Sequence, residues 1–170
     1  MEPSSFAADL AKKAGADEII PSKDVFAHTT RITGARFYKP LLGMEIPMGG
    51  FNRIYDTVGI SSTLNLSLRL LAGMGTLSVV GIGGDVKLDL TPLWLKLQTI
   101  KGVYAYGDVE FDGKKQHVFE IAMALMQAKK IRADDLVTHK FGLEEFEQMI
   151  EVNLNKGKHR AMKTVVTFNQ

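Results

Sequence analysis

The sequence predicts an α/β fold built on a parallel sheet, and two observations in the stretch 51–82 carry this prediction. First, two β-prone apolar runs, 52–58 and 76–80, flank a longer leucine-rich run, and each of the three is closed by glycine. Second, the run 76–80 is nearly continuous in apolar residues, as is typical of a strand covered on both faces of a parallel sheet. We therefore expect a strand, a helix and a parallel strand joined by a right-handed crossover.

The leucine-rich run between the two strands is predicted to be a helix. Its leucines fit a period of either 2 or 3.6 residues, so the flanking residues decide. Ser61 and Ser62 provide N-cap oxygens, and Gly73 and Gly75 provide a stop. The run is also longer than a typical strand, so we expect a helix that ends near Gly73.

The rest of the chain continues the alternation of helices and strands, which is typical of the α/β class. Helices are predicted at 6–14, 24–33, 91–98, 115–129 and 143–155. Strands are predicted at 18–20, 99–106, 136–141 and 162–168. Dense prolines and glycines favour a loop or a surface hairpin at 35–50, and a polar turn is predicted at 107–113.

Length and composition indicate a globular protein with a sizeable core, because the chain has 170 residues of which 45% are hydrophobic. The formal charge of +2, from 21 basic and 19 acidic residues, favours neither a nucleic-acid binder nor a membrane-surface protein. The absence of cysteine excludes disulfides, thiolate metal sites and a cysteine nucleophile, and we expect a cytoplasmic location. No apolar run approaches the ~20 residues that span a bilayer.

A glycine-rich stretch, Gly81-Ile82-Gly83-Gly84, follows the second strand. A dinucleotide fingerprint needs a third small residue three places after its second glycine, at the start of a helix, so that the pyrophosphate meets the helix N-terminus. Val86 stands at that place and an extended pattern follows. A strand-end turn that lines a cleft is therefore favoured over a phosphate cradle.

Charged and metal-ligating residues form no dense motif. The four histidines are far apart in sequence and have no ligand spacing, so no metal site is predicted. A basic cluster stands near the C-terminus, at Lys156, Lys158, His159, Arg160 and Lys163. It is open to two interpretations, a solvated turn before the last strand or a patch that faces an anion.

Five stretches, taken in order, resemble a known family. They are EPSSFAADLAKKAGADEII (2–20), FNRIYDTVG (51–59), GTLSVVGIGG (75–84), LTPLWLKLQTIKGVYAYG (90–107) and LVTHKFGLEEFEQMIEVNLNKGKHRAMKTVVTF (136–168). Together they are similar to the C-terminal half of the medium-chain dehydrogenases, the zinc-type alcohol and threonine dehydrogenase superfamily. The resemblance implies an incomplete doubly wound Rossmann-like parallel sheet, with strands 3 to 6 of the family order, plus a C-terminal segment of the catalytic domain. It divides the chain into residues 1–106, a partial dinucleotide-binding domain, and residues 107–170.

The same resemblance implies which residues contact a nicotinamide cofactor. Glu2 matches the acid that binds the adenosine ribose and favours NAD over NADP, although it also suits a first-turn helix charge. Thr57 and Val58 match the turn beside the adenosine, and Lys163 matches the basic residue that approaches the pyrophosphate. The residues that match the backbone around the nicotinamide are Val80, Gly81, Ile82, Val103, Tyr104 and Ala105.

Other parts of the family pattern match nothing in this chain. These are the first strand with its G-x-G-x-x-G turn, the zinc ligands and the proton relay, so no catalytic or metal-ligating residue is predicted here and zinc is expected only in the complete enzyme. In the doubly wound order, the strands at 18–20 and 52–58 would lack their neighbours and leave open edges. A complementary N-terminal half, a second copy or a local rearrangement would close them, and 99–106 offers a further edge for homo-oligomerisation.

The resemblance thus implies a fragment or split subunit of an NAD(P)-dependent alcohol dehydrogenase-like oxidoreductase, which is inactive alone. The alternative is a non-catalytic Rossmann-like subunit for assembly or nucleotide binding. A third possibility is a zinc-free relative similar to quinone reductases. The substrate stays unassigned, because the family builds its substrate pocket largely from the other half.

Overall fold

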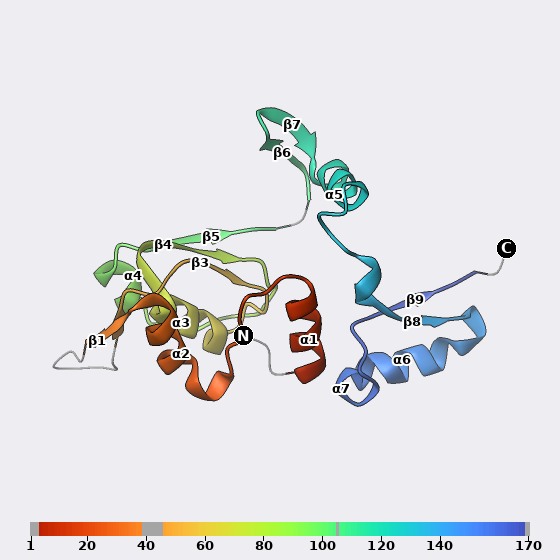
Figure 1. The fold of residues 1–170 in the computed structure, drawn as a ribbon, viewed down its shortest axis with the longest axis horizontal. Coiled ribbons are helices and arrows are strands. Elements are labelled where there is room, and N and C mark those ends of the chain that lie inside the picture. The colour runs from red at the N-terminus through yellow and green to blue at the C-terminus, as the bar shows by residue number, and fades with distance from the viewer. Residues whose placement is uncertain (1–3, 39–45, 105, 169–170) are drawn as a thin grey trace. The chain divides into compact units, whose positions relative to one another are not determined.

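The structure is a computed structural model of the chain, and it describes residues 4–38, 46–104 and 106–168 (Figure 1). The residues group into two compact units. One unit, called here the sheet unit, is Lys23–Ala105, and the second unit combines Met1–Ser22 with Tyr106–Gln170. Among the described residues, no helix is both long enough and apolar enough to cross a membrane.

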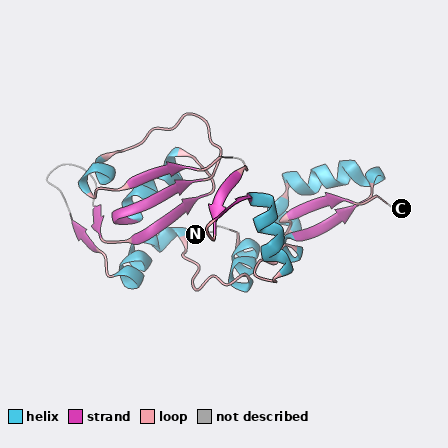
Figure 2. Ribbon diagram, turned by 90° about the horizontal axis from the view of Figure 1, so that it is seen from above, coloured by secondary structure: helices cyan, strands magenta, loops and turns pink. Residues whose placement is uncertain are grey.

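A parallel three-stranded sheet forms the centre of the sheet unit, and Figure 2 shows its strands side by side. Its strands are β3 (Phe51–Asp56), β4 (Leu71–Val79) and β5 (Thr99–Gly102), in the order β3-β4-β5. Helix α3 (Ser61–Leu70) connects β3 to β4. The parallel β3-α3-β4 unit and the α/β fold class predicted from the sequence are therefore confirmed.

The core of the sheet unit consists of leucines from α3 and β4. Leu68, Leu71 and Leu77 have no exposed surface, and Leu64 is 5% exposed. Half-buried residues pack against them, namely Ile54, Val79, Leu88 and Leu93. These leucines were ambiguous in period, and both periods are present: α3 buries Leu64 and Leu68 at helical spacing, whereas β4 begins at Leu71.

Helix α3 ends earlier than the sequence predicts. The predicted stop near Gly73 is wrong, because α3 ends at Leu70 and β4 begins at once with Leu71. The first part of β4 bulges away from β3, since the register moves from Phe51 opposite Leu71 to Arg53 opposite Thr76.

Two buried side chains from the segment before β5 allow this abrupt junction. Lys96 and Gln98 are 3% and 8% exposed, and both donate to carbonyl oxygens at the end of α3, which have no partner within the helix. Gln98 Nε2 donates to Leu68 O and Leu71 O, each at 2.9 Å. The junction is therefore closed by side chains that are distant in sequence and not by a glycine.

A short helix and a hairpin complete the sheet unit. The helix α2 (Val25–Thr33) follows the 3₁₀ turn η1 (Ser22–Asp24) and ends at Gly34, whose φ of 69° is left-handed, as expected for a C-cap glycine. Strands β1 (Arg36–Tyr38) and β2 (Ile46–Met48) pair antiparallel, which supports the hairpin alternative for 35–50, although 39–45 lie outside the described residues. Helix α4 (Thr91–Leu95) starts where the sequence predicts and has a proline in its first turn, but it ends before the predicted residue 98.

The second unit contains two small sheets. Its elements are α1 (Ser5–Lys13), β6 (Asp108–Phe111), β7 (Lys114–His117), α5 (Val118–Gln127), η2 (Asp134–Leu136), β8 (Val137–Phe141), η3 (Leu143–Glu145), α6 (Phe146–Leu154), α7 (Lys156–His159) and β9 (Lys163–Val166). Strands β8 and β9 are parallel, with a core of Phe141, Val152 and Ala161. The polar turn predicted at 107–113 is wrong, because β6 and β7 pair there as an antiparallel hairpin and α5 starts only after it.

One predicted strand does not form. Residues 18–20 are irregular, which contradicts the strand predicted there. A strand needs a neighbour to bond its backbone groups, and the doubly wound order would give 18–20 a partner that no described residue supplies. For the same reason β3 is an edge strand, since β4 is its sole neighbour among the described residues.

The leucine core gives a first test of the sheet unit. We expect Leu77→Ala to lower the free energy of unfolding by about 2–5 kcal/mol, because it removes a fully buried side chain and leaves a cavity. Leu97→Ala, at a position 72% exposed, is the matched control and should change it by less than about 0.5 kcal/mol. Denaturant unfolding measures both, and equal effects would contradict the assigned core.

Candidate functional site

The carboxyl ends of β3, β4 and β5 lie at one edge of the sheet, because the three strands are parallel. Ligands of doubly wound folds bind at such edges. The structure places seven of the predicted cofactor-contacting residues there, directly after the three strands. They are Thr57 and Val58 after β3, Val80, Gly81 and Ile82 after β4, and Val103 and Tyr104 after β5. We call these seven residues the carboxyl edge.

Backbone hydrogen bonds fix the three strand ends relative to one another. The amides of Val80 and Gly81 both donate to Asp56 O, at 2.8 and 3.0 Å. The amide of Val103 donates to Val79 O at 2.9 Å. The strand pairing therefore continues one residue beyond the assigned strands, and the carboxyl edge is a connected backbone surface.

The Asp56 side chain folds the turn that follows β3. Asp56 is 5% exposed, and its Oδ1 accepts hydrogen bonds from the amides of Val58 at 2.9 Å and Gly59 at 2.8 Å. A carboxylate that bonds amides two and three residues onward makes the local turn typical of Asp. The sequence places Asp56 in the stretch 51–59 that resembles the family, but predicts no role for it. A lone acid at the end of an apolar strand was the signal for it.

The electrostatics of Asp56 follow from these contacts. Burial by itself raises the pKa of this carboxyl group, and its hydrogen bonds outweigh that effect, so that the pKa lies below its usual value. The donors, in order of effect, are the Gly59 amide, the Thr63 hydroxyl, the Val58 amide and the Ser67 hydroxyl. Asp56 is thus an ionised carboxylate whose hydrogen-bond partners are amides of its own turn and hydroxyl groups of α3.

The glycines after β3 and β4 allow the two strand ends to touch. Gly59 has a φ of 77°, and a Cβ there would lie 2.6 Å from Gly81 O. A Cβ on Gly81 would collide with the backbone of Val58, and one on Gly83 with Gly59 O. Residues 83–90 form no helix. The structure therefore supports the strand-end turn over the phosphate cradle for this glycine-rich stretch.

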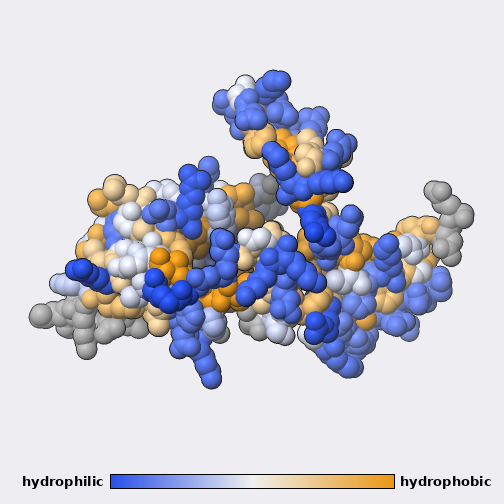
Figure 3. Space-filling view, viewed as in Figure 1, coloured by the Kyte–Doolittle hydropathy of each residue, from blue (hydrophilic) through white to orange (hydrophobic). Residues whose placement is uncertain are grey.

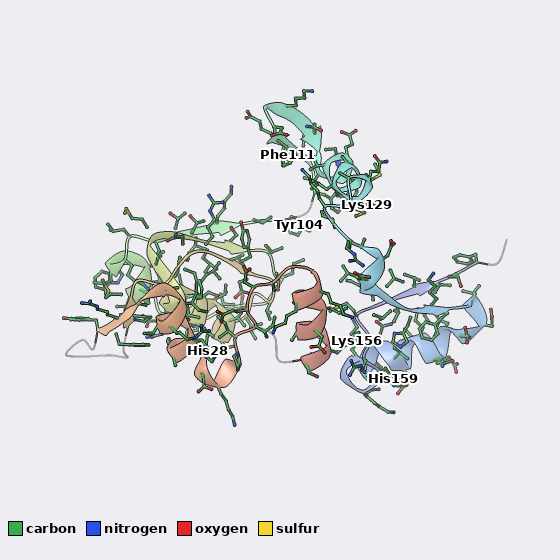
Figure 4. All side chains as sticks on the ribbon, in the orientation of Figure 1. His28, Tyr104, Phe111, Lys129, Lys156 and His159 are labelled. Carbon is green, nitrogen blue, oxygen red and sulfur yellow. The ribbon has the colours of Figure 1, made fainter. Side chains whose placement is uncertain are left out.

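The side chains of the carboxyl edge are mostly apolar and exposed. Ile82 is 83% exposed, and Tyr104, which is labelled in Figure 4 beyond the end of β5, is 84% exposed. Apolar residues also reach the surface elsewhere, as Figure 3 shows, so exposure alone does not define a site. The position of these residues at the ends of three parallel strands is what distinguishes them. Exposed apolar side chains suit contact with a planar ring.

Three predicted residues are not part of this edge as described. Glu2 and Ala105 lie outside the described residues. Lys163 is the first residue of β9 in the second unit, and its approach to a pyrophosphate stays a prediction.

Part of the basic cluster is neutralised by an acid. His159 Nε2 lies 2.8 Å from a Glu151 carboxylate oxygen, and Lys158 Nζ lies 3.7 Å from the other. The hydrogen bond from His159 is the main cause of a pKa of Glu151 below its usual value, since the effect of burial is opposite and smaller. These contacts favour the solvated-turn interpretation for His159 and Lys158; Figure 4 labels His159 beside Lys156.

The family resemblance implies two bound groups, a catalytic zinc ion and a nicotinamide cofactor, and the described residues suit them differently. Among them no three His, Cys, Asp or Glu side chains come close enough to hold a metal ion, so they do not fit a catalytic zinc, which needs about three protein ligands. The carboxyl edge fits the ring portions of a nicotinamide cofactor in chemistry and location. The diphosphate-binding turn of the doubly wound fold has no counterpart among the described residues.

The Asp56 turn gives a pH-dependent test. A carboxyl group whose pKa is lowered by folding stabilises the protein above its unfolded-state value, and this contribution is lost as pH falls through the folded-state value, here below 3.8. We expect Asp56→Asn to lower the free energy of unfolding at neutral pH by about 1.5–3 kcal/mol and by less in acid. Denaturant unfolding at both pH values measures this, with the exposed Asp85→Asn as control. A cost of Asp56→Asn that does not change with pH would refute the role of the charge.

The contact between strand ends gives a second test. We expect Gly81→Ala to destabilise the chain by about 1–3 kcal/mol, because its Cβ overlaps the Val58 backbone. Gly84→Ala, where a Cβ meets nothing within 4 Å, should leave stability nearly unchanged. Thermal unfolding of the two variants distinguishes them, and similar midpoints would contradict the close approach.

Comparisons with known proteins place this geometry in a family. Residues 1–128 match the family described as zinc-binding dehydrogenase. L-threonine 3-dehydrogenase of Pyrococcus horikoshii is 27% identical over 159 residues, which cover 89% of this chain and 39% of that protein. The chain thus spans about two fifths of the length of this relative.

Solved structures share the fold. The structure of 2R,3R-butanediol dehydrogenase from Bacillus subtilis matches with a TM-score of 0.73 and 22% identity, over 99% of this chain and 42% of that one. An alcohol dehydrogenase from Escherichia coli CFT073, complexed with NADH, matches with a TM-score of 0.72 and 18% identity, over 98% and 43%. Together with the family match, this similarity shows that the chain belongs to the zinc-binding dehydrogenase family.

Proposed function

We propose that this chain provides one side of the cofactor site in an NAD-dependent, alcohol dehydrogenase-like oxidoreductase. The observation that supports this most directly is the carboxyl edge, where seven residues that match cofactor-facing positions of the family lie at the ends of three parallel strands. Membership of the zinc-binding dehydrogenase family supports the reaction class. NAD is preferred over NADP because Glu2 matches the ribose-binding acid.

The proposed role of the chain is to bind and orient the cofactor. A bound nicotinamide supplies hydride transfer to or from an alcohol or carbonyl group. The backbone after β4 and β5, at Val80–Ile82 and Val103–Tyr104, would hold the nicotinamide ring, and the Thr57–Val58 turn would face the adenosine. Asp56 would keep the turn folded without contacting the cofactor. Lys163 matches the family's basic residue that approaches the diphosphate, and we assign it that role by resemblance alone.

The complete site requires a first half of the cofactor domain, in the same polypeptide or in a separate one. Strand β3 has a free edge among the described residues, and the doubly wound order places a strand beside it. The diphosphate turn and the zinc ligands of the family would come from that half, so we propose that residues 1–170 alone do not turn over substrate. The exposed strand β5 would pair with β5 of a second copy in an oligomer. The proposed location is the cytoplasm.

Complementation tests this proposal. We expect the purified chain to give no turnover of any alcohol in a panel, and to give NAD-dependent turnover after it is mixed or co-expressed with the first half of a full-length relative. Asp56→Asn should weaken the restored activity by more than Asp85→Asn does, since it loosens the turn. Calorimetry with NADH on the same samples measures binding separately from chemistry. Failure of both binding and turnover in the complemented sample would refute the proposal.

A non-catalytic subunit for assembly or nucleotide binding is the second candidate. It is favoured by the open edge of β3 and by the lack of a metal-ligand cluster in the described part of the chain. Saturable NADH binding without turnover in the complemented sample would support it. Turnover in a complemented enzyme that contains no zinc would instead support a zinc-free relative.

A further inference from the structure

The Lys96 side chain lies in an unusual environment in the sheet unit. Its ammonium group is buried, and it donates to three backbone carbonyl oxygens, Arg69 O at 2.8 Å, Pro47 O at 3.1 Å and Leu71 O. An ammonium has three N–H donors, so all three are used. No carboxylate of the described residues forms an ion pair with it. The positive charge is therefore held by backbone dipoles alone.

The three oxygens resemble the coordination of a metal ion. Hard cations in proteins are often held by backbone carbonyls, and rings of carbonyls select monovalent ions in channels. Arg69 O belongs to the last turn of α3, where the helix dipole is negative and favours a cation. The Arg69 guanidinium is the charged group that acts on Lys96, and it pairs with Asp89 at 2.7 Å.

Burial, with a smaller contribution from the Arg69 charge, lowers the pKa of Lys96 to about 8. The carbonyl oxygens act in the opposite direction, because they accept hydrogen bonds from the charged form. At neutral pH the side chain is therefore still mainly an ammonium ion.

The contacts of Lys96 join three elements that precede the carboxyl edge. Pro47 is in β2, Arg69 is near the end of α3 and Leu71 is the first residue of β4. The carbonyl of Lys96 also accepts from the amide of Met74, at 2.8 Å, in the bulged part of β4. The start of β4 is thereby fixed, and the strand runs from there to Val79 and the turn after it.

We infer that Lys96 is an internal substitute for a bound monovalent cation: its ammonium group locks the α3–β4 junction and thereby positions the Val80–Ile82 turn. The oxygens of Pro47, Arg69 and Leu71 form a cradle that accepts ammonium or a small alkylammonium ion once the side chain is removed. The importance of the turn for cofactor binding rests on the proposed function, but the cation cradle does not.

Chemical rescue of the full chain tests the cradle. We expect Lys96→Ala to shift the unfolding equilibrium toward the unfolded state by more than about tenfold, as for the loss of a charge-assisted hydrogen bond. Ethylammonium or ammonium chloride should restore a large part of the lost stability, whereas tetramethylammonium chloride, which has no N–H donor, should not. The wild type and the exposed Lys101→Ala variant control for general salt effects. Equal responses to the two salts would overturn the inference.

Amide hydrogen exchange tests the positioning role. The Gly81 amide, which donates to Asp56 O at 3.0 Å, should exchange about tenfold or more faster in Lys96→Ala and slow again with ethylammonium. Lys96→Met covers the case in which the alanine variant does not fold, because methionine fills the space without donors. It should show the same faster exchange and no rescue. Unchanged exchange at Gly81 in the methionine variant would refute the role, whether or not the chain binds NADH.

Discussion

The burial of unpaired carbonyl groups is the constraint on which the sheet unit depends. A helix that enters a strand without a turn leaves its last carbonyls inside the core, where an unsatisfied group costs about 1–3 kcal/mol. Lys96 and Gln98 meet this demand at the end of α3, and the leucine core closes around them. Because both side chains come from the segment that leads into β5, this segment is bonded directly to the junction between α3 and β4.

The α3–β4 junction sets the relative positions of the carboxyl ends of β3 and β4. Once the start of β4 is fixed, its register with β3 brings Val79 opposite Asp56. The side chain of Asp56 accepts hydrogen bonds from the turn after β3. Its backbone carbonyl accepts hydrogen bonds from the turn after β4. The glycines permit contact between the two backbones. A mostly apolar carboxyl edge with a connected backbone results, and this edge is the surface that we propose holds the cofactor.

The chain spans about two fifths of the length of the L-threonine 3-dehydrogenase that it resembles. Among the described residues, β4 is the sole neighbour of β3, and no cluster of metal ligands occurs. The carboxyl edge nevertheless forms without the diphosphate turn, because its geometry depends on contacts within 47–104. The fold of the zinc-binding dehydrogenase family is therefore formed in this sheet unit independently of a diphosphate turn.

The sequence by itself determined the elements whose signals are local. These include the β3-α3-β4 alternation, the end of α2 at Thr33 and the start of α4 at Thr91. Tertiary structure decided the end of α3, because Lys96 lies 27 residues from its partner Arg69. It also decided the irregular path of 18–20, since a strand forms only beside a partner. The place of Asp56 at the end of an apolar strand is a local signal, but its burial and its contacts with Thr63 and Ser67 of α3 depend on the fold. Periodicity and caps act within one turn, whereas satisfaction of buried polar groups depends on whatever the fold brings near them.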